Sequence, residues 1–177
     1  MGACPHFYKG ECVLTKMDFD IDVSGEEILS KDYTICVANN NGIIKGFKFD
    51  ESLIRILCSR FGQGMYRYKN SGKQKATFKL RLYCIVIHYL FKSIKKLPPI
   101  SLKICKDFDG KVNDINSNLR YLIETELGIK IENTSHEKLS NDSSAHEYAY
   151  LMRRDRKNKM ETYVKISLED FERFLKK

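Results

Sequence analysis

Alternating hydrophobic and acidic residues open the patterned part of the chain. In MDFDIDV (17–23) three apolar residues share one face and three aspartates share the other. That period of two predicts a β-strand with one buried face. Three carboxylates at this spacing are typical of an exposed strand edge that discourages pairing between sheets. We therefore expect Asp18, Asp20 and Asp22 to face solvent.

A β-hairpin is the clearest prediction for the next segment. YTICVA (33–38) and IIKGFKF (43–49) are both rich in β-branched and aromatic residues. Between them, Asn41-Gly42 supplies the positive φ angles that a tight primed turn requires.

Helical spacing of apolar residues, together with capping residues and helix breakers, predicts the remaining elements. Ser144 with Glu147 and Ser167 with Asp170 have the spacing of a capping box. Pro98 and Pro99 stop the longest helix. The predicted helices are 51–61, 76–97, 113–127, 144–154 and 167–177, and the predicted strands are 101–105, 129–133 and 160–166.

This order of elements predicts an α/β fold. We expect a single domain over residues 1–177, with a mixed sheet opened by a β-hairpin and helices packed on it. Residues 1–25 form a candidate N-terminal arm.

Composition favours a folded, intracellular protein. Ten Phe and ten Tyr in 177 residues argue against disorder. The N-terminus lacks the apolar segment of a secretory signal, and the longest apolar run, 82–91, is about half of a membrane span. We predict a cytoplasmic protein with no membrane partner. Most of the six cysteines lie in apolar stretches, which predicts buried free thiols, and His88 should be a buried histidine.

The charge of +8 is concentrated in one part of the chain. The 55 residues between Glu51 and Asp107 hold thirteen Lys and Arg and no acidic residue. Such a local positive field attracts polyanions, because each neutralised phosphate releases condensed counterions. DNA or RNA is therefore the predicted partner.

The loop 63–75 interleaves aromatic and basic residues in MYRYK. Cations neutralise phosphates, and exposed tyrosine rings can stack on unpaired bases. A second basic run, 153–159, follows a predicted helix. The alternatives are solvated polar turns. The candidate nucleic-acid contacts are Arg60, Tyr66, Arg67, Tyr68, Lys69, Lys73, Lys75, Lys79, Arg81, Arg153, Arg154 and Arg156.

Two carboxylates, Asp107 and Asp109, follow the predicted core strand 101–105. Carboxylates at a strand end suit Mg²⁺ or Mn²⁺, because hard cations take oxygen ligands in an open site. The alternative is an Asx turn before the next helix.

This layout resembles the ribonuclease-H-like nucleases over residues 33–177: a hairpin, helices, an acid at a core strand end and an acid at the start of a late helix. The resemblance implies a divalent-metal-dependent nuclease. Asp109 or Asp107 would take the strand-end role, and Asp142 or Glu147 the late-helix role. The layout departs at the first strand, read as YTICVANN, where Asn39 replaces the expected aspartate. The alternative function is a non-catalytic module that docks an acidic protein.

A small Cys/His cluster lies near the N-terminus. Cys4, His6 and Cys12 supply three potential zinc ligands, so a fourth would come from elsewhere in the fold. The alternative is a terminal segment with free thiols.

Overall fold

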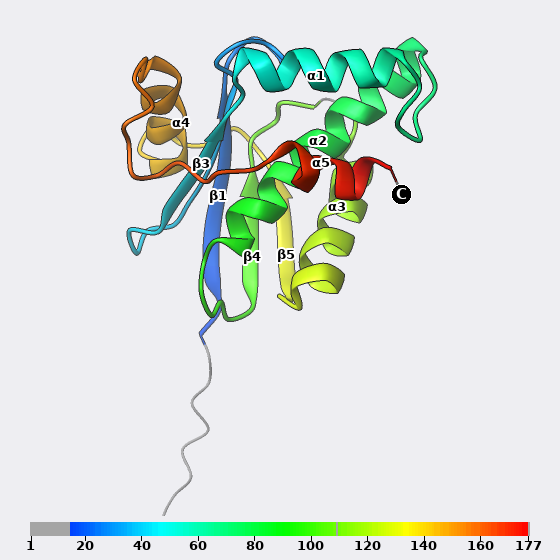
Figure 1. The fold of residues 1–177 in the computed structure, drawn as a ribbon. Coiled ribbons are helices and arrows are strands. Elements are labelled where there is room, and N and C mark those ends of the chain that lie inside the picture. Colours follow the sequence, from blue (N-terminus) through cyan, green and yellow to red (C-terminus); the bar gives the residue numbers. More distant parts are fainter. Residues whose placement is uncertain (1–14, 109, 177) are drawn as a thin grey trace, which may run out of the picture.

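Five strands form one mixed sheet in the order β3-β2-β1-β4-β5. The computed structural model describes residues 15–108 and 110–176 (Figure 1). The strands are β1 (Met17–Ser24), β2 (Thr34–Ala38), β3 (Ile44–Lys48), β4 (Ile100–Ile104) and β5 (Ile131–His136). The helices are α1 (Glu51–Gly62), α2 (Gly72–Lys92), α3 (Val112–Leu119), the π-helix η1 (Arg120–Thr125), α4 (Ser144–Arg154) and α5 (Leu168–Leu175). The predicted α/β class and mixed sheet are confirmed.

The strand β1 lies at the centre of the sheet. It pairs antiparallel with β2 and parallel with β4, while β2 and β3 form the predicted hairpin. Two expectations are therefore corrected. MDFDIDV is not an exposed edge, and YTICVANN, which contributes β2, is the second strand of the sheet instead of the first. Pairing between β1 and the distant β4 decides this position, and local periodicity does not encode it.

The segment 160–166 is not a regular strand. It contacts the edge strand β3 through one isolated bridge between Gly46 and Tyr163. Gly46 donates to the Thr162 carbonyl at 2.9 Å and accepts from the Val164 amide at 2.8 Å. The segment follows the sheet edge without extending it, so the predicted last strand is wrong beyond this bridge.

Helices lie on both faces of the sheet (Figure 1). Side chains alternate between the faces of a strand. Phe19 of β1 packs edge-on against Phe91 of α2, whereas the neighbouring Asp20 contacts Ser143 beside α4. The long helix α2 therefore covers the apolar face of β1, and α4 covers part of the acidic face.

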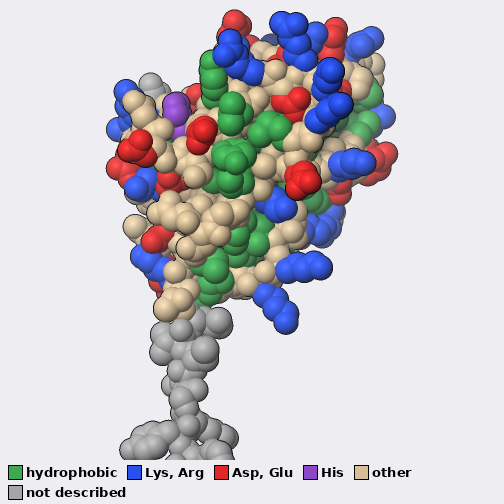
Figure 2. Space-filling view, turned by 90° about the vertical axis from the view of Figure 1, so that its left-hand side faces the viewer, with side chains coloured by type: hydrophobic (Ala, Val, Ile, Leu, Met, Phe, Trp, Pro, Cys, Tyr) green, Lys and Arg blue, Asp and Glu red, His purple; other side chains and the backbone are tan. Residues whose placement is uncertain are grey.

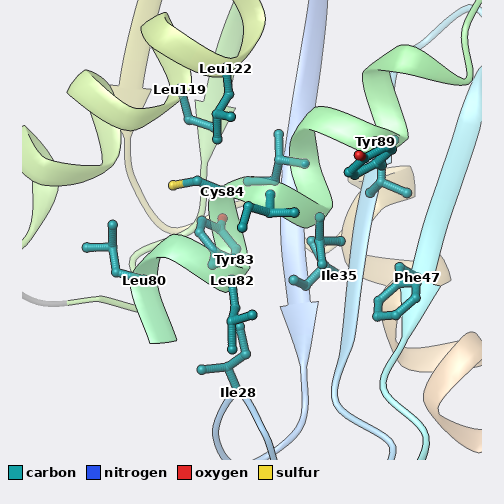
Figure 3. Close-up of a cluster of buried hydrophobic side chains, with 14 of the residues drawn as sticks. Ile28, Ile35, Phe47, Leu80, Leu82, Tyr83, Cys84, Tyr89, Leu119 and Leu122 are labelled. Carbon is teal, nitrogen blue, oxygen red and sulfur yellow. The ribbon is translucent and has the colours of Figure 1, made fainter. Parts of the chain in front are cut away.

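The core is built around α2, in which every residue from Leu80 to Phe91 is buried. A helix that is buried on all sides needs partners on all sides. Figure 3 shows these partners: Ile35 and Phe47 come from the sheet, and Leu119 and Leu122 from α3 and η1. The helix begins at Gly72, earlier than predicted, because Ser71 accepts from the Gln74 amide at 3.4 Å and caps it.

No helix within residues 15–108 and 110–176 combines the length and the apolar character needed to cross a bilayer.

His88 of α2 predicts a pH dependence of stability. It is 2% exposed, with Nδ1 2.7 Å from the Leu122 carbonyl oxygen. Burial lowers the pKa of His88 below its ordinary value, although the Leu122 carbonyl opposes this. The unfolded chain therefore binds a proton near pH 6.5 that the folded protein does not bind. We expect the contribution of His88 to the free energy of unfolding to fall as the pH drops through about 6.5 and to level off about one pH unit above it.

Urea unfolding of the wild type and His88→Gln between about pH 7 and about pH 5.5 measures this effect. The slope against pH should be smaller in the variant. His136→Gln is the control. Burial also lowers the pKa of His136, but this variant should keep the part of the pH slope that comes from His88. An unchanged slope in His88→Gln would contradict the assignment.

Candidate functional site

The acidic face of β1 meets the beginning of α4. The Ser143 hydroxyl donates to Asp20 Oδ2 at 2.7 Å, and His146 Nδ1 lies 2.7 Å from Asp22 Oδ2. Asp22 is buried, with 6% of its surface exposed. Ser143 is the N-cap residue of α4 but makes no capping hydrogen bond, so the predicted capping box at Ser144 is absent. The Ser143 hydroxyl binds the sheet instead.

A polar pocket of about 380 Å³ lies at the carboxyl ends of β1 and β4. Its lining residues are Asp22, Val23, Cys105, Lys106, Asp107, Lys138, Leu139, Asn141 and His146. In α/β sheets, ligands commonly bind beyond the carboxyl ends of parallel strands. The fold thus brings two carboxylates and two ammonium groups together at such a position.

Asp107 is held from the other side by Tyr33. The Tyr33 hydroxyl donates to Asp107 Oδ2 at 2.5 Å. Burial, and then the hydrogen bond to Asp107, raises the pKa of Tyr33 far above its usual range. Tyr33 therefore remains a donor at every physiological pH, and it fixes the orientation of the carboxylate.

Asp22 and Asp107 are the carboxylates of this pocket that could coordinate a metal ion. Among the residues that the structure describes, no three His, Cys, Asp or Glu side chains gather closely enough to hold a metal. Proteins often bind Mg²⁺ through only one or two carboxylates, with water and substrate phosphates completing the shell. Asp22 and Asp107 fit that pattern by their chemistry.

The other predicted acids lie elsewhere. Glu147 and Asp142 are exposed at the start of α4 and do not line the pocket. Sequence reasoning missed Asp22, Asp20 and His146. The alternation of aspartates in MDFDIDV is the signal that could have identified them, but the same alternation is typical of an exposed strand edge. Four predicted ligands, Asp109, Cys4, His6 and Cys12, lie outside the described residues.

The tyrosines of the basic loop are core residues. Tyr66 and Tyr68 are 5% and 6% exposed, and both rings pack against Phe78. The Tyr66 hydroxyl donates to Glu172 Oε1 at 3.3 Å. The prediction that these rings stack on bases is therefore corrected, because neither ring faces solvent.

Several cations of the acid-free stretch have partners within the protein. Arg60 pairs with Glu172, and Lys79 Nζ lies 2.5 Å from Glu27 Oε2. Arg81 is buried. The exposed predicted contacts that remain in this segment are Arg67, Lys69, Lys73 and Lys75. Roughly half of the predicted contacts therefore stabilise the fold or lie inside it.

The second basic run builds a surface pocket of about 480 Å³ at the end of α4. Its lining residues are Lys31, Asp32, Tyr150, Arg153, Arg154 and Arg156. Within residues 15–108 and 110–176, none of these three arginines has a carboxylate within 4.0 Å. Figure 2 views the molecule from the side that carries α4, and lysine and arginine side chains crowd its upper edge.

The position of α4 depends on β3. Lys48 Nζ donates to the Met152 and Asp155 carbonyl oxygens at 3.2 and 2.8 Å, which satisfies the end of the helix. Gly46 lies directly below Met152, and a Cβ at residue 46 would lie 2.4 Å from the Met152 sulfur. The close approach fixes the helix over the sheet and aligns both of its ends with the pockets.

Comparisons of the chain with family models, curated proteins and solved structures found no match.

Proposed function

We propose that this protein binds nucleic acid along α4 and cleaves it with a divalent metal ion held by Asp22 and Asp107. One observation carries the proposal. Asp22 lies near the carboxyl end of β1, Asp107 follows its parallel neighbour β4, and the two line one pocket together with Lys106 and Lys138. Carboxylates hold the cation that would neutralise a phosphodiester, and lysines bind its oxygens.

The central position of β1 supports a ribonuclease-H-like arrangement for the proposed nuclease. The resemblance calls for an acid on the first strand, an acid at the end of a core strand and a polar group on a late helix. β1 is the first described strand of the sheet and carries Asp20 and Asp22. Asp107 follows β4, and α4 supplies His146. Asn39, which follows β2, is therefore not the residue to compare with the aspartate expected on the first strand; Asp20 and Asp22 of β1 are.

The helix α4 joins the carboxylate pocket to the basic pocket. Its eleven residues span about 16 Å, with His146 near one end and Arg153 and Arg154 at the other. Exposed arginines bind backbone phosphates without regard to sequence. Tyr150, which is 48% exposed between them, offers a ring for base stacking. We propose that a strand lies along this helix and that single-stranded or irregular nucleic acid is preferred.

A second function, binding without cleavage, is favoured by the satisfied state of the carboxylates. Asp107 accepts from Tyr33, and Asp22 lies within hydrogen-bonding distance of His146. The two functions share one binding surface and differ only in turnover with Mg²⁺ or Mn²⁺.

Replacing Arg153 and Arg156 together with Gln is expected to weaken binding of single-stranded oligonucleotides and to flatten its salt dependence. Two lost phosphate contacts should reduce the slope of log K against log[salt] by about 1.4. Fluorescence anisotropy of labelled DNA and RNA at several salt concentrations, without metal, measures both effects.

Lys95→Gln/Lys96→Gln is the matched control, because it removes the same charge from exposed lysines after α2. The control should keep the wild-type slope. No binding by the wild type, or an equal loss in both double variants, would contradict the proposed surface.

A further inference from the structure

A separate basic pocket lies on the α2 side of the sheet, where α2, α3, η1 and α5 meet. Its volume is about 250 Å³. Its lining residues are Arg67, Arg81, Ser117, Asn118, Tyr121 and Phe174. Two arginines and no acid line it, and none of these residues belongs to the pockets at α4. The pocket therefore carries a net positive charge of its own.

Arg81 is an unusual arginine because it is buried without a counter-ion. It is 6% exposed, and no carboxylate of the described residues forms an ion pair with it. Its Nη1 donates to Asn118 Oδ1 at 2.5 Å, while its Nε has no hydrogen-bond partner. Arginine stays protonated in proteins, so this is a buried charge. Burying a charge without a partner is strongly unfavourable unless a ligand compensates for it.

The guanidinium is held in place by its surroundings. Asn118 Nδ2 donates to the Asp114 carbonyl at 2.8 Å, which turns Asn118 Oδ1 toward Arg81. The Arg81 guanidinium carbon lies 5.6 Å from the centre of the Tyr121 ring and 5.8 Å from that of Phe174. A charge fixed between two rings is preorganised for a ligand in the pocket.

Arg67 supplies the second cation. Its side chain is exposed, and Nε and Nη2 donate to the Tyr68 hydroxyl at 3.3 and 3.2 Å. Its amide donates to the Leu175 carbonyl, which ties the loop to the last helix. Burial lowers the pKa of Arg81; Tyr68 opposes this, and the like charge of Arg67 lowers it further. An anion between the two guanidinium groups would relieve this repulsion.

The carboxylate of Glu126, which contacts the pocket residue Tyr121, already has partners of its own. Glu126 accepts from the Tyr121 hydroxyl at 2.9 Å and pairs with Arg173 at 3.2 Å. Tyr121 belongs to the π-helix η1, and π-helical turns are frequent at functional sites. Tyr121 is 43% exposed and lines the pocket.

We propose that this pocket binds the phosphate group of a nucleotide or of a phosphorylated strand end through Arg81 and Arg67. Two guanidinium groups match the double charge of a phosphate monoester better than the single charge of a carboxylate. The Ser117 hydroxyl and the Tyr121 ring suit the remaining oxygens and an attached base. This site stands independently of cleavage at Asp22 and Asp107.

Isothermal titration calorimetry with inorganic phosphate and with AMP, in chelator and without divalent metal, tests the site. Wild-type protein should bind both, and Arg67→Gln and Arg81→Gln should each weaken binding at least about tenfold, as expected for the loss of a charge-assisted hydrogen bond. Arg120→Gln is the matched control, since Arg120 is exposed on η1 and does not line the pocket. It should bind as the wild type does.

Arg67→Gln keeps the test decisive if Arg81→Gln does not fold, because Arg67 is exposed. No binding of phosphate or AMP by the wild type would overturn the proposal, as would wild-type affinity in Arg67→Gln.

Two oligonucleotides that differ only in a 5′-phosphate or a 5′-hydroxyl identify the source of the phosphate. A preference for the phosphorylated strand that Arg67→Gln abolishes indicates a strand end, whereas tighter binding of AMP than of either strand indicates a free nucleotide. Arg153→Gln/Arg156→Gln should bind phosphate normally. The experiments therefore distinguish a wrong proposal for nucleic-acid binding along α4 from a wrong proposal for phosphate binding in this pocket.

Discussion

Asp22→Asn is expected to reduce divalent-metal-dependent cleavage by at least about 100-fold, because a metal bound there contributes several kcal/mol to catalysis. The substitution keeps the size of the side chain and an oxygen that can contact His146. It removes the negative charge that the cation requires. Asp22 is buried where β1 meets α4, and His146 is within hydrogen-bonding distance of it. Oligonucleotide binding without metal should stay close to that of the wild type.

A gel assay of labelled oligonucleotides with Mg²⁺, Mn²⁺ or chelator measures the cleavage. Asp18→Asn is the matched control: Asp18 lies on the same strand and face, is exposed, and does not line the pocket. Asp107→Asn should behave as Asp22→Asn does. Cleavage at the wild-type rate in Asp22→Asn would rule out this metal site, and a wild type that binds but never cleaves would establish binding alone.

Phe78→Ala is expected to lower the free energy of unfolding by about 3–5 kcal/mol, the usual result of removing a buried aromatic ring. Phe78 is 1% exposed. Its ring centroid lies 4.7 Å from that of Phe61, 5.6 Å from that of Tyr66 and 5.7 Å from that of Tyr68. Three rings thus lose a packing partner together, and the loop 63–71 loses the contacts of its two tyrosines with α2.

Urea unfolding followed by circular dichroism measures this loss. Ile56→Ala on α1 is the control, because Ile56 is 39% exposed and surface substitutions usually change stability by less than about 0.5 kcal/mol. A change below about 1 kcal/mol in Phe78→Ala would contradict the burial of Tyr66 and Tyr68 and would restore base stacking as their role.

Much of the fold could be predicted from local sequence. The hairpin of β2 and β3 is present, but its predicted tight primed turn is not, because the ladder closes at Ala38 and Ile44 and only Gly42 of the Asn41-Gly42 pair has a positive φ. Asn39 closes the longer loop by accepting from the Asn41 and Ile43 amides. The capping box at Ser167 and Asp170 is present, because it too is a contact within one turn. The burial of α2 follows from its apolar residues on every side. In these cases the chemistry and the partners lie within a few residues.

The candidate site could be predicted only in part. The sequence placed Asp107 at a strand end and identified Arg153, Arg154 and Arg156 as an unbalanced basic run. It did not distinguish tyrosines that face a ligand from tyrosines that pack on Phe78. A sequence in which basic residues alternate with tyrosines is compatible with either arrangement. A loop has no periodicity from which buried and exposed side chains could be told apart.

The sequence by itself determined the α/β class, most of the strands and helices, and the concentration of positive charge between residues 52 and 106. Only the tertiary structure decided that β1 is central, that α4 covers its aspartates, and that Arg81 is buried beside Arg67. A local sequence pattern indicates which face of a strand or helix is apolar. It does not indicate which distant segment packs against each face, because that depends on how the whole molecule packs.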